Sequence, residues 1–186
     1  MRSIVKNLFI ALAFLTLAGG AANAQSFAGG KHPSNLRDTE DQIFHKIVML
    51  PNYGLWDHIT YQVNDGTVIL GGSTYSLGTK KEAERVVKRV PGVQNVVNNI
   101  RELPPSPFDD QIRRELVSRI ANMGGLSRYL ENVNPPVRLI VDHGHVALEG
   151  IVSTRSDANM MRMAALGVPG VFSVENHLIV KDEMVR

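Results

Sequence analysis

The chain has 186 residues, with 20 basic and 18 acidic side chains and no cysteine. A disulfide framework is therefore excluded, so a hydrophobic core must stabilise the fold. Arg2 and Lys6 carry two of the basic charges and precede the predominantly apolar run Leu8–Leu17. Without these two, the balance is 18 against 18, and bulk charge gives no support to a nonspecific nucleic-acid binder.

The first 24 residues have the pattern of a secretory signal peptide. The positive start and the apolar run are followed by the small-residue site Ala22-Asn23-Ala24. The run is about half of the roughly 20 residues that span a bilayer, which favours cleavage after Ala24 over a retained anchor. We expect export to a periplasm-like compartment. Because no cysteine follows the cleavage site, no lipid anchor is expected, and the polar residues 25–37 are predicted to form a flexible leader.

One pattern then occurs twice. Pro91-Gly92-Val93 recurs as Pro169-Gly170-Val171, and Asp41-Gln42-Ile43 recurs as Asp110-Gln111-Ile112. The two offsets differ, so the loop Asn122–Pro136 is about nine residues longer than its counterpart. A repeat of this length indicates two structural units. The predicted domains are 38–103 and 108–181, joined by the proline-rich linker 104–107 and followed by the polar tail 182–186.

In the first unit the predicted helix begins near Asp38, where Thr39 and Gln42 have the spacing of a capping box. Alternating apolar residues on both sides of Asp65-Gly66 predict a β-hairpin, because this dipeptide suits a tight turn with positive φ. A helix is predicted over Lys80–Val90 and a third strand over Val93–Ile100.

In the second unit Ser106 is predicted to cap a helix that has Pro107 in its first turn. The hairpin follows, with His143-Gly144 at its turn, then a helix over Asn159–Val168 and a strand over Val171–Val180. The predicted fold class is α+β. Two tandem αββαβ domains are expected, each a three-stranded mixed sheet covered on one face by two helices.

These residues resemble a tandem of BON domains, a small exported bacterial module. In the first copy the resemblance rests on Asp65-Gly66, Val68–Gly72, Ala83 and the stretch from Pro91 to Asn98. The second copy carries the corresponding residues His143-Gly144, Val146–Gly150 and the stretch from Pro169 to Asn176.

The resemblance implies a non-enzymatic periplasmic protein of envelope maintenance or osmotic stress. It also implies contact with anionic phospholipid surfaces, which is expected to be reversible. No cofactor is expected, and the charge balance gives no reason to expect a nucleic-acid partner. The alternative is a protein-interaction, scaffolding or chaperone-like envelope module with an envelope protein as its partner. This chain departs from the family in having His143 at a turn position that is usually acidic and in lacking a lipid anchor.

The helix of the first unit offers the candidate lipid site. On a helical wheel Lys81, Arg85, Lys88 and Arg89 gather opposite the apolar stripe, where they can bind phosphate headgroups. The alternative is a solvated face, moderated by acidic neighbours such as Glu82 and Glu84.

In the matching helix of the second unit, Met163 and Leu166 replace two of these cations and point away from their own core. They are candidates for an interaction surface. Their partner is the first domain, another chain or acyl chains, and the pattern favours packing against protein.

Two further groups have a functional and a structural interpretation. His143, His145 and His177 are able to ligate zinc, but no carboxylate follows at a recognisable spacing, so no metal site is predicted. Tyr53 and Trp56 fit either an interfacial anchor or a loop that covers a small core, and the second is favoured. The chain contains none of the common nucleophile, phosphate-loop or metalloprotease motifs, and no catalytic residue is predicted.

Overall fold

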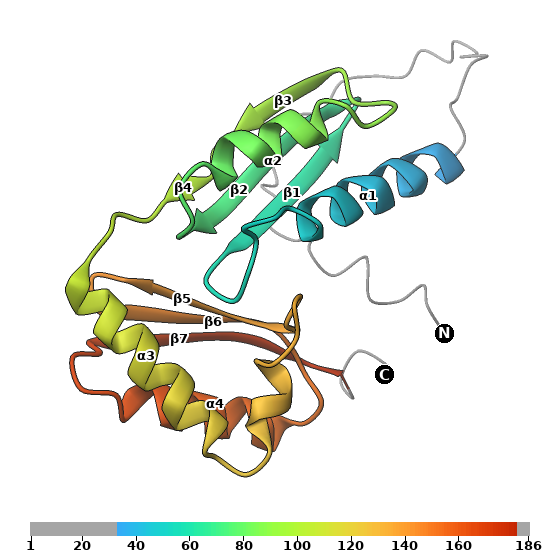
Figure 1. The fold of residues 1–186 in the computed structure, drawn as a ribbon. Helices are drawn as coiled ribbons and strands as arrows, with labels where there is room; N and C mark the ends of the chain where they lie inside the picture. Colours follow the sequence, from blue (N-terminus) through green and yellow to red (C-terminus); the bar gives the residue numbers. More distant parts are fainter. Residues whose placement is uncertain (1–32, 182–186) are drawn as a thin grey trace, which may run out of the picture.

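The computed structural model describes residues 33–181. The predicted signal peptide, the residues of the predicted leader up to 32 and the tail 182–186 lie outside the described residues. The first unit contains α1 Pro33–Val48, β1 His58–Asn64, β2 Thr67–Thr74, α2 Thr79–Val87, β3 Asn95–Asn98 and β4 Arg101–Glu102 (Figure 1). The second contains α3 Pro107–Ala121, the 3-10 helix η2 Leu126–Tyr129, β5 Val137–Asp142, β6 His145–Val152, α4 Arg155–Leu166 and β7 Ser173–Val180.

Both sheets are mixed, which confirms the predicted α+β class. β1 pairs with β2 in an antiparallel hairpin and β2 pairs with β3 in parallel; β5, β6 and β7 repeat this arrangement. The prediction of three strands is wrong for the first sheet, because β4 also pairs with β2. β3 ends at Asn98, and β4 lies beyond the end of the predicted strand Val93–Ile100. The side chain of Asn98 accepts a hydrogen bond from the backbone N–H of Ile100 between the two strands.

The two hairpin turns have the backbone that the sequence predicts. Asp65 and Gly66 have φ of 47° and 78°, and His143 and Gly144 have φ of 50° and 79°. Both central residues of each turn therefore lie in the left-handed region, as a type I′ turn requires.

A glycine at the far end of each hairpin permits a close approach of the chain. A Cβ on Gly72 would lie 2.0 Å from the carbonyl oxygen of His58, and one on Gly150 would lie 2.1 Å from that of Pro136. Both glycines have positive φ, at 89° and 114°. The chain can enter β1 and β5 along these paths only because neither glycine carries a side chain.

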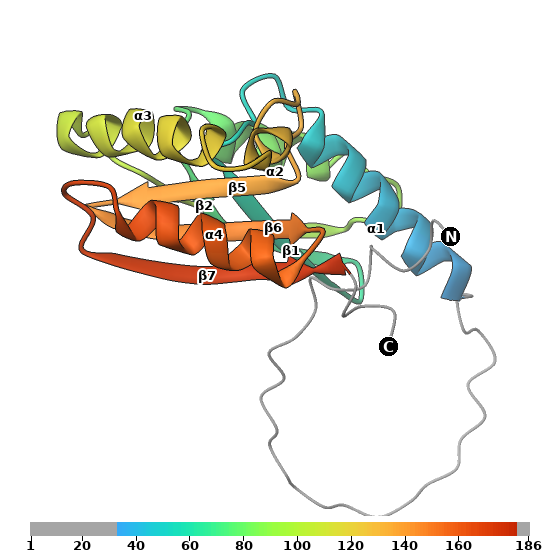
Figure 2. The ribbon, with the colours of Figure 1, turned by 90° about the horizontal axis from the view of Figure 1, so that it is seen from below.

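Each unit has its own hydrophobic core between its helices and one face of its sheet. Figures 1 and 2 show α3 and α4 on the same side of the β5–β7 sheet. The first core contains Ile43, Ile47, Leu50, Ile59, Val68, Leu70, Ala83, Val87, Val90, Val96 and Ile100. The second is centred on Ile112, Leu116, Ile120, Leu139, Leu148, Met161 and Ala165.

Several predicted helix boundaries are wrong. α1 begins at Pro33, so Thr39 lies inside the helix and caps nothing; its hydroxyl instead donates to the carbonyl oxygen of Pro91. α2 ends at Val87, three residues before the predicted end. α4 begins at Arg155, because the Thr154 hydroxyl accepts from the backbone N–H of Asp157 and caps it there. The Ser106 cap of α3 is confirmed.

The longer loop of the second unit is partly helical. It contains η2, whose Leu126 and Tyr129 are buried in the second core. The Tyr129 hydroxyl donates to the carboxylate of Asp157 (2.7 Å) and accepts from the backbone N–H of Ser153 (2.8 Å). The additional residues therefore fill the core beside α4.

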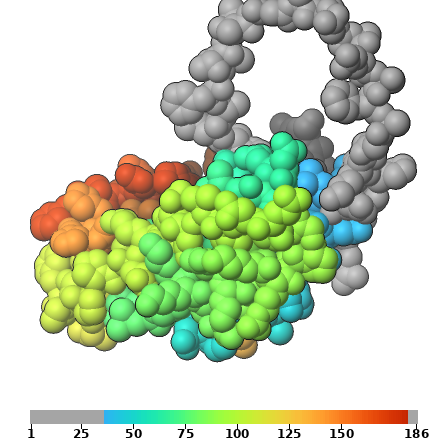
Figure 3. All heavy atoms as spheres, turned by 90° about the horizontal axis from the view of Figure 1, so that it is seen from above, coloured from blue at the N-terminus to red at the C-terminus, as the bar shows by residue number. Residues whose placement is uncertain are grey.

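The two units are in contact through the open face and edge of the second sheet (Figures 1 and 3). The backbone N–H of Leu139 on the edge strand β5 donates to the carbonyl oxygen of Leu55, in the loop before β1. Leu55 and Trp56 pack against the second core. The prediction that the loop tryptophan covers a small core is confirmed, but the core belongs to the other unit. No helix within residues 33–181 combines the length and apolar character needed to cross a membrane.

Candidate binding surfaces

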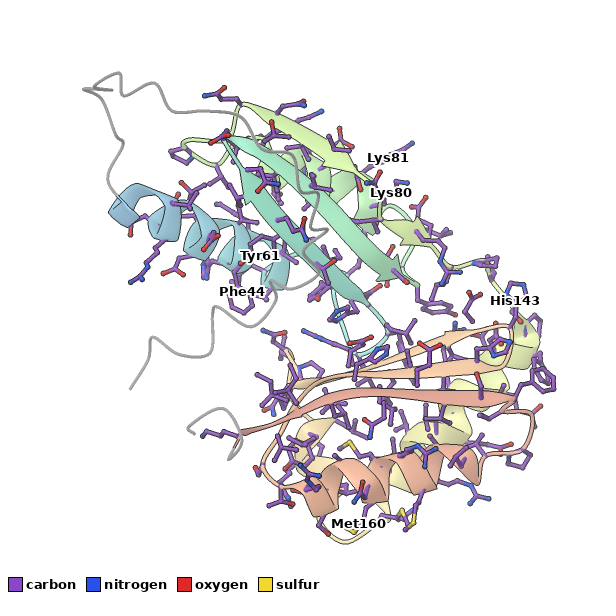
Figure 4. The ribbon with its side chains drawn as sticks, turned by 180° about the vertical axis from the view of Figure 1, so that it is seen from behind. Phe44, Tyr61, Lys80, Lys81, His143 and Met160 are labelled. Atoms are coloured by element: carbon purple, nitrogen blue, oxygen red, sulfur yellow. The ribbon has the colours of Figure 1, made fainter. Side chains whose placement is uncertain are left out.

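The predicted basic surface lies on α2 and the turn after it. Lys81, Arg85, Lys88 and Arg89 are all exposed, and Figure 4 shows the labelled Lys81 at the start of the helix, next to Lys80. We refer to the four exposed cations as the α2 basic face. Lys88 is the C-cap residue and Arg89 follows it, so half of the face belongs to the end of the helix.

Two of the four cations are paired within the helix. Arg85 forms an ion pair with Glu82, and Lys88 forms one with Glu84, which lowers the pKa of that carboxyl. Lys81 and Arg89 form no ion pair with the residues that the structure describes. Exposed pairs of this kind contribute little free energy, so a phosphate group can compete for the paired cations.

The predicted apolar pair of the second unit is exposed. The exposed fractions are 59% for Met163 and 49% for Leu166. Figure 4 places α4, marked by Met160, on the side of the second unit that faces away from the first. Contact with the first unit, one of the three predicted partners, is therefore excluded, and another chain or acyl chains are left.

The three histidines considered for zinc have separate partners. Nδ1 of His143 lies 2.6 Å from Asp142, that of His145 2.7 Å from Ser173 Oγ, and that of His177 2.6 Å from Glu149. Over residues 33–181, no group of three or more acidic or histidine side chains is placed to hold a metal ion. The hydrogen bond with Glu149 raises the pKa of His177 above its usual value.

Polar side chains connect the two units at one end of their interface. The Tyr75 hydroxyl donates to Asp110 (2.8 Å), and the guanidinium of Arg113 lies 4.0 Å from the centre of the Tyr75 ring. Arg113 also donates to Asp110 (2.7 Å) and to the carbonyl oxygen of Val141 (2.7 Å). Arg101 forms an ion pair with Asp142. These contacts hold the end of β2 against the start of α3.

At the other end of the interface the units enclose a groove of about 290 Å³. We call it the inter-unit groove. In the first unit it is lined by α1, by Tyr53 in the loop before β1 and by β1 itself; Phe44 of α1 and Tyr61 of β1 are labelled in Figure 4. In the second it is lined by the loop before β5, by Arg138 of β5 and by the end of β6. Its lining residues are Phe44, Ile47, Val48, Tyr53, His58, Ile59, Thr60, Tyr61, Asn134, Pro135, Pro136, Arg138, Gly150 and Ile151.

A buried arginine lies in the wall of this groove. Arg138 is 7% exposed, and its guanidinium carbon lies 4.6 Å from the centre of the Tyr53 ring. Its Nη2 donates to the side-chain oxygen of Asn134, but its Nη1 has no hydrogen-bond partner among the described residues. Burial lowers the pKa of the guanidinium from its usual value. The nearby Asp57 is occupied by the backbone N–H groups of Gly54, Tyr75 and Ser76.

Sequence reasoning missed the groove and a second surface feature. Phe108 and Phe172 are 47% and 71% exposed, and their rings stack 6.1 Å apart at the turn end of the second sheet. Both features combine residues from elements that are distant in the sequence. Only the position of Arg138 between the apolar residues Val137 and Leu139 was visible as an anomaly in the sequence.

This arrangement, a pair of helices on a small mixed sheet repeated once, defines a protein of two similar α+β domains. The chain belongs to the BON domain family, whose pattern matches residues 49–104 and 108–182. The predicted family is therefore confirmed. BON domains are non-catalytic binding modules known for phospholipid binding.

One curated relative is an uncharacterized protein in the gshII 5' region of Anaplasma centrale. It is 26% identical over 140 residues, which cover 72% of this chain and 89% of the relative. Among solved structures, the C-terminal domain of CdsD, a structural protein of the type III secretion system of Chlamydia trachomatis, aligns with 75% of this chain and 96% of its own. The identity is 15% and the TM-score 0.29, which supports no conclusion about role.

Proposed function

We propose that this protein is an exported, periplasmic binding module that contacts anionic phospholipid surfaces reversibly through the α2 basic face. The observation that carries the proposal is the exposure of all four cations of α2 and its C-terminal turn in a family of phospholipid-binding modules. The units act as two domains, 38–103 and 108–181, joined by 104–107. The physiological role is envelope maintenance or stress.

The electrostatics of this face favour a weak, salt-sensitive contact. Each basic residue near an anionic membrane surface contributes about 1 kcal/mol, and this contribution falls off within a Debye length. Because Arg85 and Lys88 first have to leave Glu82 and Glu84, Lys81 and Arg89 make the earliest contacts. Reversible attachment follows, since a few charges by themselves give only modest affinity.

Charge reversal on α2 tests the assignment. We expect the substitutions Lys81→Glu, Arg85→Glu, Lys88→Glu and Arg89→Glu, made together, to abolish flotation with vesicles that contain phosphatidylglycerol. The matched control reverses four exposed cations elsewhere, Arg114, Arg119, Arg162 and Lys181, and so changes the net charge equally. If both variants lose binding to the same extent, net charge and not this face governs the contact.

A second candidate function is a protein-interaction or scaffolding module, for which Met163 and Leu166 supply the surface. Their exposure on a helix that faces away from the first unit favours this candidate. Light scattering of Met163→Asp tests it. An oligomer in the parent protein that becomes a monomer in the variant supports the interaction surface, and identical masses count against it.

A further inference from the structure

We propose that the inter-unit groove binds an unbranched fatty acid, with the acyl chain between the two units and the carboxylate at Arg138. This site is separate from the α2 basic face and does not depend on the proposed function. The inference starts from two observations: an apolar groove of about 290 Å³, and an arginine in its lining whose buried Nη1 has no hydrogen-bond partner among the described residues.

The walls of the groove suit an acyl chain. Phe44 and Ile47 of α1 face the groove from the first unit, and Pro135, Pro136 and Ile151 face it from the second. Phe44 is 41% exposed although it is a large apolar residue. A volume of about 290 Å³ lies at the small end of the range of ligand pockets, which fits one medium-length chain better than the two chains of a phospholipid.

The charge of the groove selects an anion. Arg138 is the only residue with a permanent charge among those that line it, and none of them is acidic. Burial lowers the pKa of His58, the other titratable base in the lining, and Glu149 beside it opposes that shift. A buried guanidinium N–H without an acceptor is unfavourable, and a carboxylate is the acceptor whose geometry suits it.

The position of Arg138 explains why the site needs both units. Arg138 is on β5, on the face of the sheet opposite the second core, and its guanidinium stacks on Tyr53 of the first unit. Asn134 accepts from Nη2, whereas Nη1 is buried and has no acceptor among the described residues, so a small movement of the guanidinium is needed to present Nη1 to a carboxylate. The first unit thus supplies the aromatic and helical wall, and the second supplies the cation.

Calorimetric titration of residues 25–186 with hexanoate, octanoate and decanoate, each below its micellar concentration, tests the proposal. We expect saturable binding at one site. The affinity should rise roughly fourfold for each added methylene until the groove is filled. Decanol should bind at least tenfold more weakly than decanoate, and decyltrimethylammonium should not bind at the site. Absence of saturable decanoate binding would overturn the proposal.

Two substitutions test which residues contact the carboxylate and the acyl chain of the ligand. Arg138→Gln should lower the affinity for decanoate at least tenfold and leave that for decanol unchanged. Phe44→Ala should weaken both, whereas Leu36→Ala, which removes an exposed apolar side chain of the same helix outside the groove, should weaken neither. If Arg138→Gln does not fold, the comparison of Phe44→Ala with Leu36→Ala decides. Equal decanoate affinity in these two variants would contradict the assignment.

A final comparison separates this site from the phospholipid contact. We expect Arg138→Gln to float with anionic vesicles as the parent protein does, and the α2 charge-reversed variant to bind decanoate normally. Displacement of decanoate by soluble dihexanoyl phosphatidylglycerol would show that a two-chain lipid is the occupant, which would overturn the assignment of a single-chain acid.

Discussion

Asp109 shows how a single residue connects two elements of the second unit. It lies in the first turn of α3 and is 1% exposed. Its carboxylate accepts hydrogen bonds from the backbone N–H groups of His143 (3.0 Å) and Gly144 (2.8 Å). The start of the helix is thereby attached to the β5–β6 turn. The type I′ turn leaves these two donors pointing outward, where they need an acceptor.

We expect Asp109→Ala to lower the free energy of unfolding by about 2–3 kcal/mol, because two buried donors to a charged acceptor lose their partner. Urea denaturation followed by circular dichroism measures the change. Glu175→Ala, which removes a largely exposed carboxylate, is the control and should change stability by less than about 0.5 kcal/mol. Equal effects of the two substitutions would contradict the role given to Asp109.

His177 makes the stability of the folded protein depend on pH, and the direction of its pKa shift gives the sign. Its hydrogen bond with Glu149 and the charge of Glu175 raise its pKa, so the folded protein binds this proton more tightly than the unfolded chain does. Protonated His177 therefore stabilises the folded state. This stabilisation is present below the ordinary histidine pKa of about 6.5 and is lost as the pH rises through the raised pKa of the folded state.

The substitution His177→Gln should therefore destabilise the protein at pH 5.5, by less than about 1 kcal/mol because the pair is exposed, and have no effect at pH 8.5. NMR titration of the histidine side chains provides the direct measurement, with His177 above and His58 below the ordinary value. A larger loss at pH 8.5 than at pH 5.5 would contradict the pairing.

Among the elements, the two hairpins depend most strictly on glycine. We expect Gly72→Ala and Gly150→Ala each to cost at least about 2 kcal/mol, because the new Cβ meets a backbone carbonyl oxygen that cannot move aside. Gly54→Ala is the matched control, since its Cβ has no neighbour within 4 Å. Thermal denaturation compares the three, and a neutral Gly150→Ala would mean that the backbone at this position relaxes without cost, which would contradict the requirement for glycine.

The elements that sequence periodicity predicts best are those whose pattern is local. Apolar residues at every second position flank Asp65-Gly66 and His143-Gly144, and the turn dipeptides fix the register of the strands, so both hairpins are confirmed. Boundaries fail where a tertiary contact decides. Thr39 has the spacing of a cap, but its hydroxyl is bound by Pro91, 52 residues away. The helix η2 was missed because its burial depends on Asp157, in a different helix.

At the scale of the whole molecule, the first unit completes the core of the second. Leu55 and Trp56 lie against the second core, and Leu55 extends the edge of the β5–β7 sheet by a backbone hydrogen bond of 2.8 Å. We expect Trp56→Ala to lower the stability of the second unit by about 2–3 kcal/mol through the loss of this packing.

The prediction is checked by hydrogen exchange of amides in β5 and β6, with Leu77→Ala as the control, because Leu77 is 74% exposed. Faster exchange confined to the first unit in Trp56→Ala would contradict the packing of this side chain across the interface.

The candidate surfaces also differ in how far the sequence predicts them. The α2 basic face and the exposed Met163 and Leu166 follow from helical spacing within one segment, so the sequence alone predicts their exposure. The inter-unit groove brings together residues near 44, 60, 135 and 150. No local pattern predicts how two units pack, and the groove therefore emerges only from the structure.

The central claim, peripheral binding to an anionic lipid surface, is tested most directly by flotation of residues 25–186 with vesicles at low and at moderate salt. Vesicles of phosphatidylcholine alone are compared with vesicles that also contain phosphatidylglycerol. We predict flotation only with the anionic vesicles, and its loss as the salt concentration rises. Absence of flotation under every condition, or equal flotation with both lipids regardless of salt, would contradict the account.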